Sequence, residues 1–409
     1  MRLAVASPFV DRRHGTERAL AELLERLARD YDCEIHLYSQ RVEELSLREP
    51  PFVSPERASG IVWHKLPSLP GPHLLQFLFW FYSNGLWRWT DKFLRGISFD
   101  LVLSPGINCA DADVVIVHAL FHRLRELSQE SAESALRGLG FFRRLHRRAY
   151  YALLSRLERR SYSNPKVALA AVSSRTAGLL AKSFNRTDVV VIPNGVDTTQ
   201  FSPSARLARR ETVRARWQFQ PNEFVLLLVG NDWGNKGLPA LLEALSLLPQ
   251  IPAKLLIVGD DEPAPFRAVA QRLGILNRCI WELPLTDILD VYAAADLYVS
   301  PSREDSFGMP VAEAMACGLP VITTVFAGIS SLLHDGVDSF VLRDPSDAKI
   351  LAERISMLYA KPELRIQTGR AAADVSRKWT WDRNAAAVWQ FLKEVHTPKN
   401  SPTLRSQKQ

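Results

Sequence analysis

Short apolar segments alternate with amphipathic segments along most of the chain, and this alternation limits the fold more than any other feature. The apolar segments are rich in Val, Leu and Ile and run without polar interruption, as strands do when both of their faces are buried. Such strands occur in parallel sheets covered by helices, so we predict an α/β fold with doubly wound sheets. The expected strands of a first sheet are residues 2–7, 34–39, 61–66, 101–103, 114–117, 167–172 and 189–192.

The alternation is interrupted once and then begins again. Pro193-Asn194-Gly195 is typical of a turn, and the polar residues 198–210 follow it. A chain of 409 residues is too long for one ordinary core and suits two domains. A cleft between the domains is the expected ligand site, because open parallel sheets bind ligands beyond the carboxyl ends of their strands. The expected strands of the second sheet are residues 224–229, 254–258, 278–281, 297–300, 321–323 and 339–342.

The sequence therefore divides into four expected parts. Residues 1–200 form an N-terminal domain and residues 201–380 a C-terminal domain. An amphipathic helix at residues 381–396 is expected to pack back on the N-terminal domain. The polar tail at residues 397–409 is expected to be disordered.

The composition excludes several classes of protein. Four widely spaced cysteines without a CxxC pair favour buried free thiols in a reducing compartment over a disulfide scaffold. The chain has no run of 18 apolar residues and no signal-peptide pattern, so we expect a cytoplasmic protein without a transmembrane helix. No cluster has the spacing of metal ligands, and Asp111-Ala112-Asp113 precedes its strand rather than ending it.

Basic charge is concentrated in one segment. From Arg137 to Arg160 the sequence has eight arginines and one acid, Glu158, which gives this segment the same net charge of +7 as the whole chain. This distribution favours contact with an anionic surface or ligand at one place, not general nucleic-acid binding. Its interleaved apolar residues suit either a peripheral helix at the inner face of a membrane or a helix packed on the sheet. Residues 73–89, rich in Leu, Phe and Trp, suit interfacial insertion, an acceptor-binding wall or simple packing.

Two acids lie around one predicted strand-to-helix connection, in the sequence PSREDSFGMPVAEAMACGLPV at residues 301–321. The loop and the start of the following helix, where Pro310 is tolerated, offer backbone N–H groups to an anion. Asp305 in the loop and Glu313 in the first helical turn are expected to reach one pocket and to suit vicinal hydroxyls of a sugar. The spacing alone equally suits two acids that only stabilise the helix start.

This segment resembles the donor-binding signature of family 4 glycosyltransferases, retaining enzymes of the GT-B fold, which carry two glutamates separated by seven residues. The resemblance implies two Rossmann-like domains that face a central cleft. It implies that Asp305, which replaces the first glutamate, contacts the donor sugar, and that Glu313 contacts the ribose. Because Asp is one methylene shorter, Glu304 beside it is expected to compensate.

Three further residues match loops of the same family. Lys236 in VGNDWGNKG (residues 229–237) stands where a lysine stabilises the departing diphosphate, whereas Asn231 replaces the usual arginine. Gly15 lies in the loop where the family has a Gly-Gly pair that faces the diphosphate. His118 ends a strand, and the resemblance implies a place near the donor sugar. The alternative for His118 is a partly buried histidine whose hydrogen bonds are satisfied. The implied catalytic residues are Lys236, Asp305 and His118, and the implied donor-binding residues are Gly15, Asn231, Lys236, Asp305, Ser306, Phe307, Gly308, Met309 and Glu313.

Together these matches predict a retaining transferase that moves a hexose from a nucleoside diphosphate sugar to an acceptor hydroxyl, in cell-surface polysaccharide or glycolipid synthesis. The C-terminal domain would bind the donor, and the N-terminal domain a saccharide or lipid-linked acceptor. Catalysis would rest on positioning and electrostatic stabilisation, with no cofactor, metal or protein nucleophile. Two alternatives stay open: a GT-B nucleotide-sugar epimerase, and a donor-binding but inactive scaffold protein, which the departures at Asn231 and Asp305 would suit.

Overall fold

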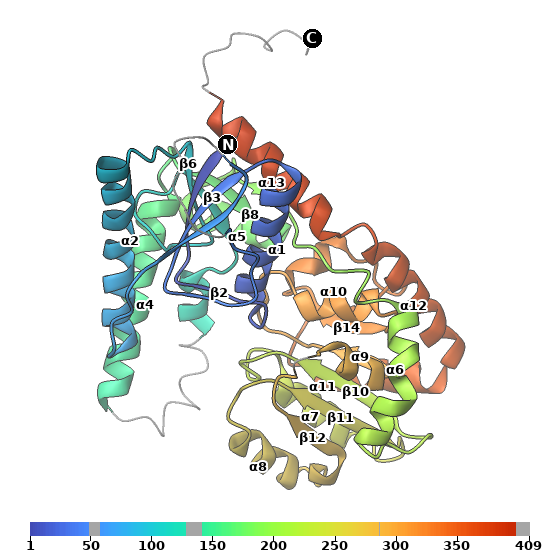
Figure 1. Ribbon diagram of the computed structural model, residues 1–409. Coiled ribbons are helices and arrows are strands. Elements are labelled where there is room, and N and C mark those ends of the chain that lie inside the picture. Colours follow the sequence, from blue (N-terminus) through green and yellow to red (C-terminus); the bar gives the residue numbers. More distant parts are fainter. Residues whose placement is uncertain (49–57, 128–140, 286, 398–409) are drawn as a thin grey trace, which may run out of the picture. The chain divides into compact units, whose positions relative to one another are not determined.

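A computed structural model describes residues 1–48, 58–127, 141–285 and 287–397. The chain forms two compact units (Figure 1). The first unit contains Met1–Val172, Thr176–Ile192 and the chain from Asp382 onward, and the second contains Ser173–Arg175 and Pro193–Trp381. The second unit therefore begins before the predicted boundary at residue 200. Apart from Thr397, the predicted tail lies outside the described residues.

The first unit is built on a seven-stranded parallel sheet with the order β5-β3-β1-β6-β7-β8-β9. Every predicted strand of this sheet is confirmed, with ends that differ by one residue at most. A separate pair, β2 (Phe9–Val10) with β4 (Arg41–Val42), was not predicted, because two residues are too few to show a pattern. The strand bounds are β1 Arg2–Ala6, β3 Glu34–Ser39, β5 Gly60–Lys65, β6 Leu101–Ser104, β7 Val114–Val117, β8 Ala168–Ala171 and β9 Val190–Val191.

The second unit is built on a six-stranded parallel sheet with the order β12-β11-β10-β13-β14-β15. All six strands were predicted, and β10 and β11 are almost completely buried, which explains their continuous apolar sequences. The order places β13 directly beside β10, so the loops that follow these two strands leave the same edge of the sheet. The bounds are β10 Phe224–Val229, β11 Ala253–Val258, β12 Cys279–Glu282, β13 Leu297–Val299, β14 Val321–Thr324 and β15 Phe340–Leu342.

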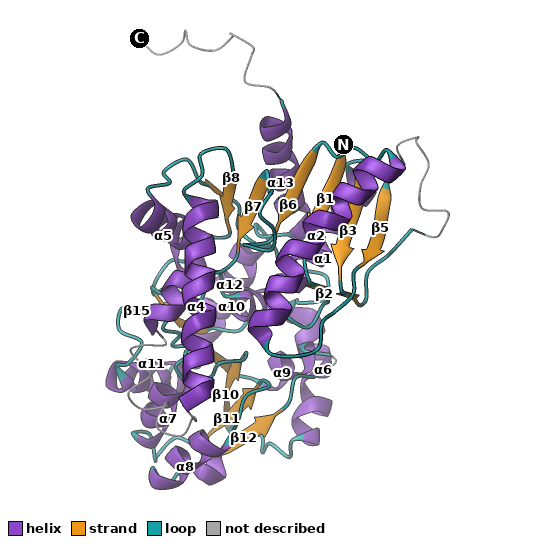
Figure 2. Ribbon diagram, turned by 90° about the vertical axis from the view of Figure 1, so that its left-hand side faces the viewer, coloured by secondary structure: helices purple, strands orange, loops and turns teal. Residues whose placement is uncertain are grey.

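Helices flank the strands of each unit (Figure 2). In α1 the predicted face of Leu20, Leu23, Leu24 and Leu27 is buried. The polar residues predicted to join the domains mostly form α6, whose N-terminus is capped by the Ser202 side chain. The helices that lie wholly or mainly in the first unit are α1 Gly15–Asp30, α2 His73–Arg95, α4 Phe141–Tyr162, α5 Ser174–Phe184 and α13 Trp381–His396. Those of the second are α6 Pro203–Arg216, α7 Leu238–Ser246, α8 Ala264–Arg272, α9 Leu289–Ala294, α10 Met309–Ala316, α11 Ala348–Ala360 and α12 Pro362–Ser376.

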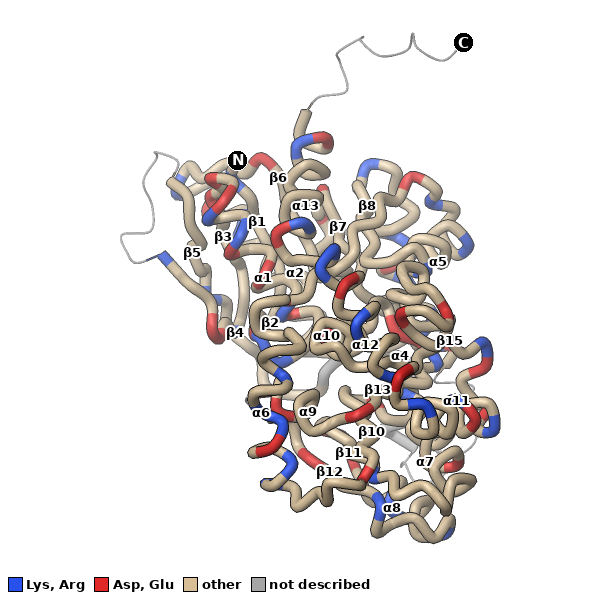
Figure 3. The backbone as a smooth tube through the Cα atoms, turned by 90° about the vertical axis from the view of Figure 1, so that its right-hand side faces the viewer, with Lys and Arg blue, Asp and Glu red and all other residues tan. Residues whose placement is uncertain are grey.

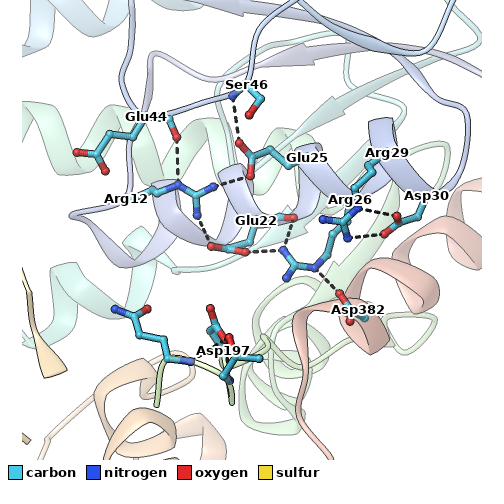
Figure 4. A network of polar contacts seen from close by, with 12 residues as sticks. Arg12, Glu22, Glu25, Arg26, Arg29, Asp30, Glu44, Ser46, Asp197 and Asp382 are labelled. Carbon is cyan, nitrogen blue, oxygen red and sulfur yellow. Dashed lines mark hydrogen bonds and ion pairs between the residues drawn. The ribbon is translucent and has the colours of Figure 1, made fainter. Parts of the chain in front are cut away.

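Helix α13 is joined to α1 by an ion pair. Arg26 Nε lies 2.7 Å from Asp382 Oδ1, and Arg26 also pairs with Glu22 on its own helix (Figure 4). The ring of Trp389 lies 5.4 Å from that of Tyr31, the C-cap residue that follows α1. These contacts explain why the chain from Asp382 onward belongs to the first unit.

The surface and the thiols fit an ordinary globular protein. In the view of Figure 3, basic and acidic positions are interspersed along both units. All four cysteines are free; Cys33, Cys109 and Cys317 are buried, as predicted, whereas Cys279 is partly exposed. Burial raises the pKa of the Cys109 thiol to about 11, so this thiol stays protonated at neutral pH. Within the described part of the chain, no helix has both the length and the apolar character needed to cross a bilayer.

Candidate functional site

Lys236 and Asp305 form an ion pair between two neighbouring loops of the second unit. Lys236 Nζ lies 2.5 Å from Asp305 Oδ2. Lys236 follows β10 and Asp305 follows β13, so the parallel pairing of these strands brings the two loops together. Each side chain keeps 16% of its surface exposed, so both charges remain accessible to a ligand. Two of the three residues predicted to be catalytic therefore meet in the structure.

Glycines allow the backbone of these loops to approach closely. Gly237 has a φ of +80°, and a Cβ added to it would lie 2.0 Å from the carbonyl oxygen of Pro301. A Cβ on Gly259 would lie 2.3 Å from the carbonyl oxygen of Gly230. Only glycine fits either position without a shift of the backbone. The loops after β10, β11 and β13 are thus packed against one another at the level of main chain.

Asn231, which stands where the family usually has an arginine, also joins two of these loops. Its side-chain oxygen accepts a hydrogen bond of 2.8 Å from the backbone N–H of Asp260. Asn231 is exposed, and its neighbour Trp233 is buried, with a backbone N–H that donates to Asp261 Oδ2 at 2.8 Å. This position therefore provides a link between the loops after β10 and β11 instead of a second cation.

Glu304, the residue expected to compensate for the shorter Asp305, is paired with Arg175. The Arg175 guanidinium donates two hydrogen bonds to the Glu304 carboxylate, of 2.9 and 2.6 Å, and lies over the ring of Phe326 at 4.9 Å. Asn235 Nδ2 donates to the Glu304 carbonyl oxygen at 2.8 Å. Arg175 thus engages this buried carboxylate in a bidentate pair, and the compensation for Asp305 stays a prediction. Sequence reasoning missed Arg175 because 129 residues separate it from Glu304.

The loop from Ser306 to Met309 is held mainly by its backbone. The Ser306 carbonyl oxygen accepts a hydrogen bond of 2.7 Å from Ser173 Oγ, and the Phe307 carbonyl oxygen accepts one of 2.6 Å from the N–H of Ile329. The Phe307 side chain is buried, so only its backbone can reach a ligand. Gly308, with a φ of +98°, precedes α10, and no side chain of the described residues caps this helix start. An uncapped helix N-terminus favours an anion.

Glu313 lies in the second turn of α10, not in the first turn as predicted, because the helix begins at Met309. The carboxylate is buried, and Tyr292 OH donates a hydrogen bond of 2.7 Å to Oε2. Burial, together with the Glu313 charge, raises the pKa of Tyr292 well above its usual value, so this hydroxyl remains a donor. The Glu313 side chain is therefore held in one orientation by α9.

Gly15 and His118, the other two predicted residues, belong to the first unit. Gly15 is the first residue of α1, and no described atom lies within 4 Å of the position of an added Cβ. Burial lowers the pKa of His118, which follows β7, to about 4, so this imidazole is neutral at pH 7. His14 is more than half exposed and lies 2.9 Å from Asp11. Burial would raise the pKa of Asp11, but hydrogen bonds from His14 and Arg13 lower it overall.

The two acids of Asp111-Ala112-Asp113 make contacts that stabilise the first unit. Asp111 forms an ion pair with Arg88 of α2, and Asp113 Oδ2 accepts a hydrogen bond of 2.8 Å from the N–H of Val102. Among the described residues, no group of three His, Cys, Asp or Glu side chains could hold a metal ion.

Comparison with known proteins relates both parts of the chain to glycosyltransferases. Residues 209–375 match the family described as glycosyl transferases group 1, and residues 13–200 match glycosyltransferase family 4. The lipopolysaccharide glucosyltransferase WaaG of Escherichia coli is 30% identical over 185 residues, which are 44% of this chain and 50% of WaaG. A D-inositol 3-phosphate glycosyltransferase of Xylanimonas cellulosilytica is 31% identical over 207 residues, 48% of this chain and 49% of that protein. The chain thus spans about half the length of the curated relatives that it matches.

Solved structures resemble nearly the whole chain. The crystal structure of WaaG, a glycosyltransferase involved in lipopolysaccharide biosynthesis, has a TM-score of 0.73 at 20% identity and covers 95% of this chain and 99% of its own. Anabaena HepE, solved in complex with UDP and glucose, has a TM-score of 0.67 at 18% identity and covers 96% of this chain and 99% of its own. These structures confirm the predicted fold class, two doubly wound α/β domains of the GT-B type. The chain belongs to the glycosyltransferases that the group 1 and family 4 descriptions define.

Proposed function

We propose that this chain transfers a hexose from a nucleoside diphosphate sugar to an acceptor hydroxyl, with retention of the anomeric configuration. The observation that carries the proposal is the ion pair between Lys236 and Asp305, which joins two strand-end loops beside the start of α10. Both strand-end loops and helix starts are common places for phosphate groups in α/β folds. Relatives support the class of donor: WaaG is a glucosyltransferase, and HepE was solved with UDP and glucose.

In this proposal the donor exchanges one partner of Lys236 for another. The diphosphate oxygens replace the Asp305 carboxylate at Lys236 Nζ, and the released carboxylate accepts hydrogen bonds from hydroxyls of the sugar. Lys236 and the N-terminus of α10 then stabilise the negative charge that grows on the departing diphosphate. Because Asn231 carries no charge, Lys236 supplies the cationic stabilisation from this loop alone. In this proposal Lys236 and the start of α10 balance the charge of the diphosphate without a metal ion.

Glu313 and the backbone of the loop before α10 complete the proposed donor site in the second unit. Glu313, oriented by Tyr292, accepts hydrogen bonds from the ribose hydroxyls. The backbone of Ser306–Met309 binds sugar and diphosphate oxygens through its N–H groups. In the first unit, Gly15 and His118 stay candidates for contacts with the diphosphate and the sugar: the Cα of Gly15 faces open space, and the His118 imidazole is neutral at pH 7.

We further propose a saccharide or lipid-linked acceptor and peripheral contact with the inner face of a membrane. The described side chains of α4 support this contact: Arg156, Arg159 and Arg160 are exposed. Glu158, the acid of this helix, is buried and accepts hydrogen bonds from the N–H groups of Phe121 and His122, at 2.6 and 2.7 Å. The exposed charge of α4 is therefore positive. Arg137, where the predicted basic segment begins, lies outside the described residues.

Turnover assays with UDP-, GDP- and ADP-hexoses test the reaction, with saccharide and lipid-linked acceptors and with no acceptor. We expect one donor to be consumed only with acceptor, and to give a product that keeps the donor's anomeric configuration. Lys236→Met should abolish this turnover, whereas Lys254→Met, at a lysine of β11 that pairs with Glu223, should not.

The alternatives give different results in the same assays. If an epimerised donor forms without acceptor, the protein is an epimerase and not a transferase. Tight donor binding without turnover for every acceptor would favour the inactive scaffold protein.

A further inference from the structure

Helix α2 has a second apolar stripe in addition to the face that it buries. Its buried face includes Trp80, Asn84, Arg88 and Asp91. On the opposite side, five large side chains follow one another at spacings of three, four and seven residues, which places them along one line of a helix. Each of them has between 52% and 73% of its surface exposed. These residues, which we call the α2 stripe, are Leu75, Tyr82, Leu86, Trp89 and Phe93.

Aromatic side chains dominate the C-terminal half of the stripe. The rings of Trp89 and Phe93 stack on each other, with centroids 5.3 Å apart and planes inclined by 4°. Trp87 and Leu94 extend the exposed apolar surface next to them, with 41% and 75% of their surface accessible. A contiguous exposed patch of this kind marks an interaction surface on a water-soluble unit. Tyr and Trp in particular favour the boundary between water and lipid.

The exposed charged residues of α2 itself have one sign. Lys92 and Arg95 are exposed on α2. The acid of this helix, Asp91, is buried; it pairs with Arg95 at 3.0 Å and accepts a hydrogen bond from Tyr38 OH at 2.7 Å. The neighbouring helix α4 lies alongside, where the rings of Phe77 and Tyr150 are 6.2 Å apart (Figure 1). The exposed charges among the described side chains of α4 are arginines. The two helices therefore combine apolar and cationic surface, with no exposed carboxylate among the residues described there.

We infer that α2 lies along an anionic lipid surface, with the α2 stripe inserted among the lipid chains and Lys92 and Arg95 at the headgroups. Apolar contact and attraction to anionic headgroups each add to the affinity of such a helix. A second copy of the chain suits this surface less well, because pairing two stripes would bring cationic flanks together without opposing acids. This inference specifies the membrane contact proposed above. It rests on the proposed function only in linking that contact to a lipid-linked acceptor.

Vesicle binding of the full chain tests this inference. We expect the protein to co-sediment with vesicles of phosphatidylcholine mixed with phosphatidylglycerol, and much less with phosphatidylcholine alone. The double variant Trp89→Ser/Phe93→Ser should lower the partition coefficient at least about tenfold, because two large apolar groups no longer leave water. The matched control is Leu207→Ser/Ile366→Ser, which removes exposed apolar residues of α6 and α12 and should bind like the wild type.

Three results would overturn the inference. They are equal binding to neutral and anionic vesicles, equal binding by the stripe variant and the control, and a wild-type dimer in light scattering that the stripe variant abolishes. Circular dichroism checks that each variant is folded. Calorimetric binding of UDP-, GDP- and ADP-hexoses, measured in parallel, separates this test from the proposed reaction: the stripe variant should keep the donor affinity of the wild type.

Discussion

Gly237 offers the sharpest test of how the two charged loops are assembled. Its φ of +80° is a backbone conformation that costs any other L-residue about 1–2 kcal/mol. In Gly237→Ala the new Cβ would also lie 2.0 Å from the oxygen and 2.7 Å from the carbon of the Pro301 carbonyl group. Relieving this overlap requires a shift of backbone, for which we expect a further cost of about 1–3 kcal/mol. The substitution should therefore lower the free energy of unfolding by about 2–5 kcal/mol in total.

Gly274→Ala is the matched control, because it separates the backbone cost from the overlap. Gly274 belongs to the same unit and has a φ of +70°, but no described atom lies within 4 Å of an added Cβ. This variant should lose only about 1–2 kcal/mol. Urea-induced unfolding, followed by circular dichroism and tryptophan fluorescence, gives both values, and their difference should be about 1–3 kcal/mol.

The same substitution should affect the site. Since Pro301 begins the loop that carries Asp305, a shift at Gly237 separates Lys236 from Asp305, and affinity for the donor should fall. Gly274→Ala should keep the wild-type affinity. If Gly237→Ala costs no more stability than Gly274→Ala and leaves donor affinity unchanged, the close approach of the two loops is refuted.

Three further predictions concern other contacts of the structure. Arg175→Ala leaves the buried Glu304 carboxylate without its guanidinium partner and should lower the free energy of unfolding by about 1–3 kcal/mol. The double variant Arg175→Ala/Glu304→Gln should recover part of this loss in urea unfolding. Equal stability of the single and double variants would contradict this role of Arg175. Asp305→Asn removes the carboxylate that competes for Lys236, so calorimetry should find that the nucleoside diphosphate alone binds more tightly and the intact donor more weakly; parallel changes for both ligands would count against the exchange of partners. Burial lowers the pKa values of His36 and His118 to about 4, so the folded state favours the neutral rings, and stability present above pH 6.5 should be lost as the pH falls toward 4. Each ring contributes at most about 3 kcal/mol to this loss of unfolding free energy. In His118→Gln, the unfolding free energy measured with urea should fall less steeply between pH 7 and pH 5. An unchanged slope would contradict the contribution of His118.

Most of the fold could be predicted from the sequence because the central strands are buried on both faces. β7 and β10 were predicted with the ends that the structure shows, since they are buried apolar runs. β3 was also predicted with its observed ends, although it buries Glu34, His36 and Ser39 among its apolar residues. The two-residue strands β2 and β4 carry too little pattern to be found. The start of α6 was read as part of a connection because much of its surface is exposed and polar.

The candidate site could be predicted only where its residues lie within one local motif. The loop with Asp305 and the turn with Lys236 each contain glycines at fixed offsets, and these offsets can be recognised along the chain. The partners that orient the acids cannot be recognised in this way. Arg175 is 129 residues from Glu304, and Tyr292 is 21 residues from Glu313, so only the folded chain reveals either contact.

The central claim is that the second unit binds a nucleoside diphosphate sugar through Lys236, and calorimetric titration tests it most directly. UDP-, GDP- and ADP-hexoses are titrated into the wild type, into Lys236→Met and into the control Lys254→Met. We predict that one donor binds the wild type and the control with similar Kd, and binds Lys236→Met at least about tenfold more weakly, because a charge-assisted hydrogen bond to the diphosphate is lost. An unchanged Kd in folded Lys236→Met, or a folded wild type that binds none of these donors, would contradict the claim.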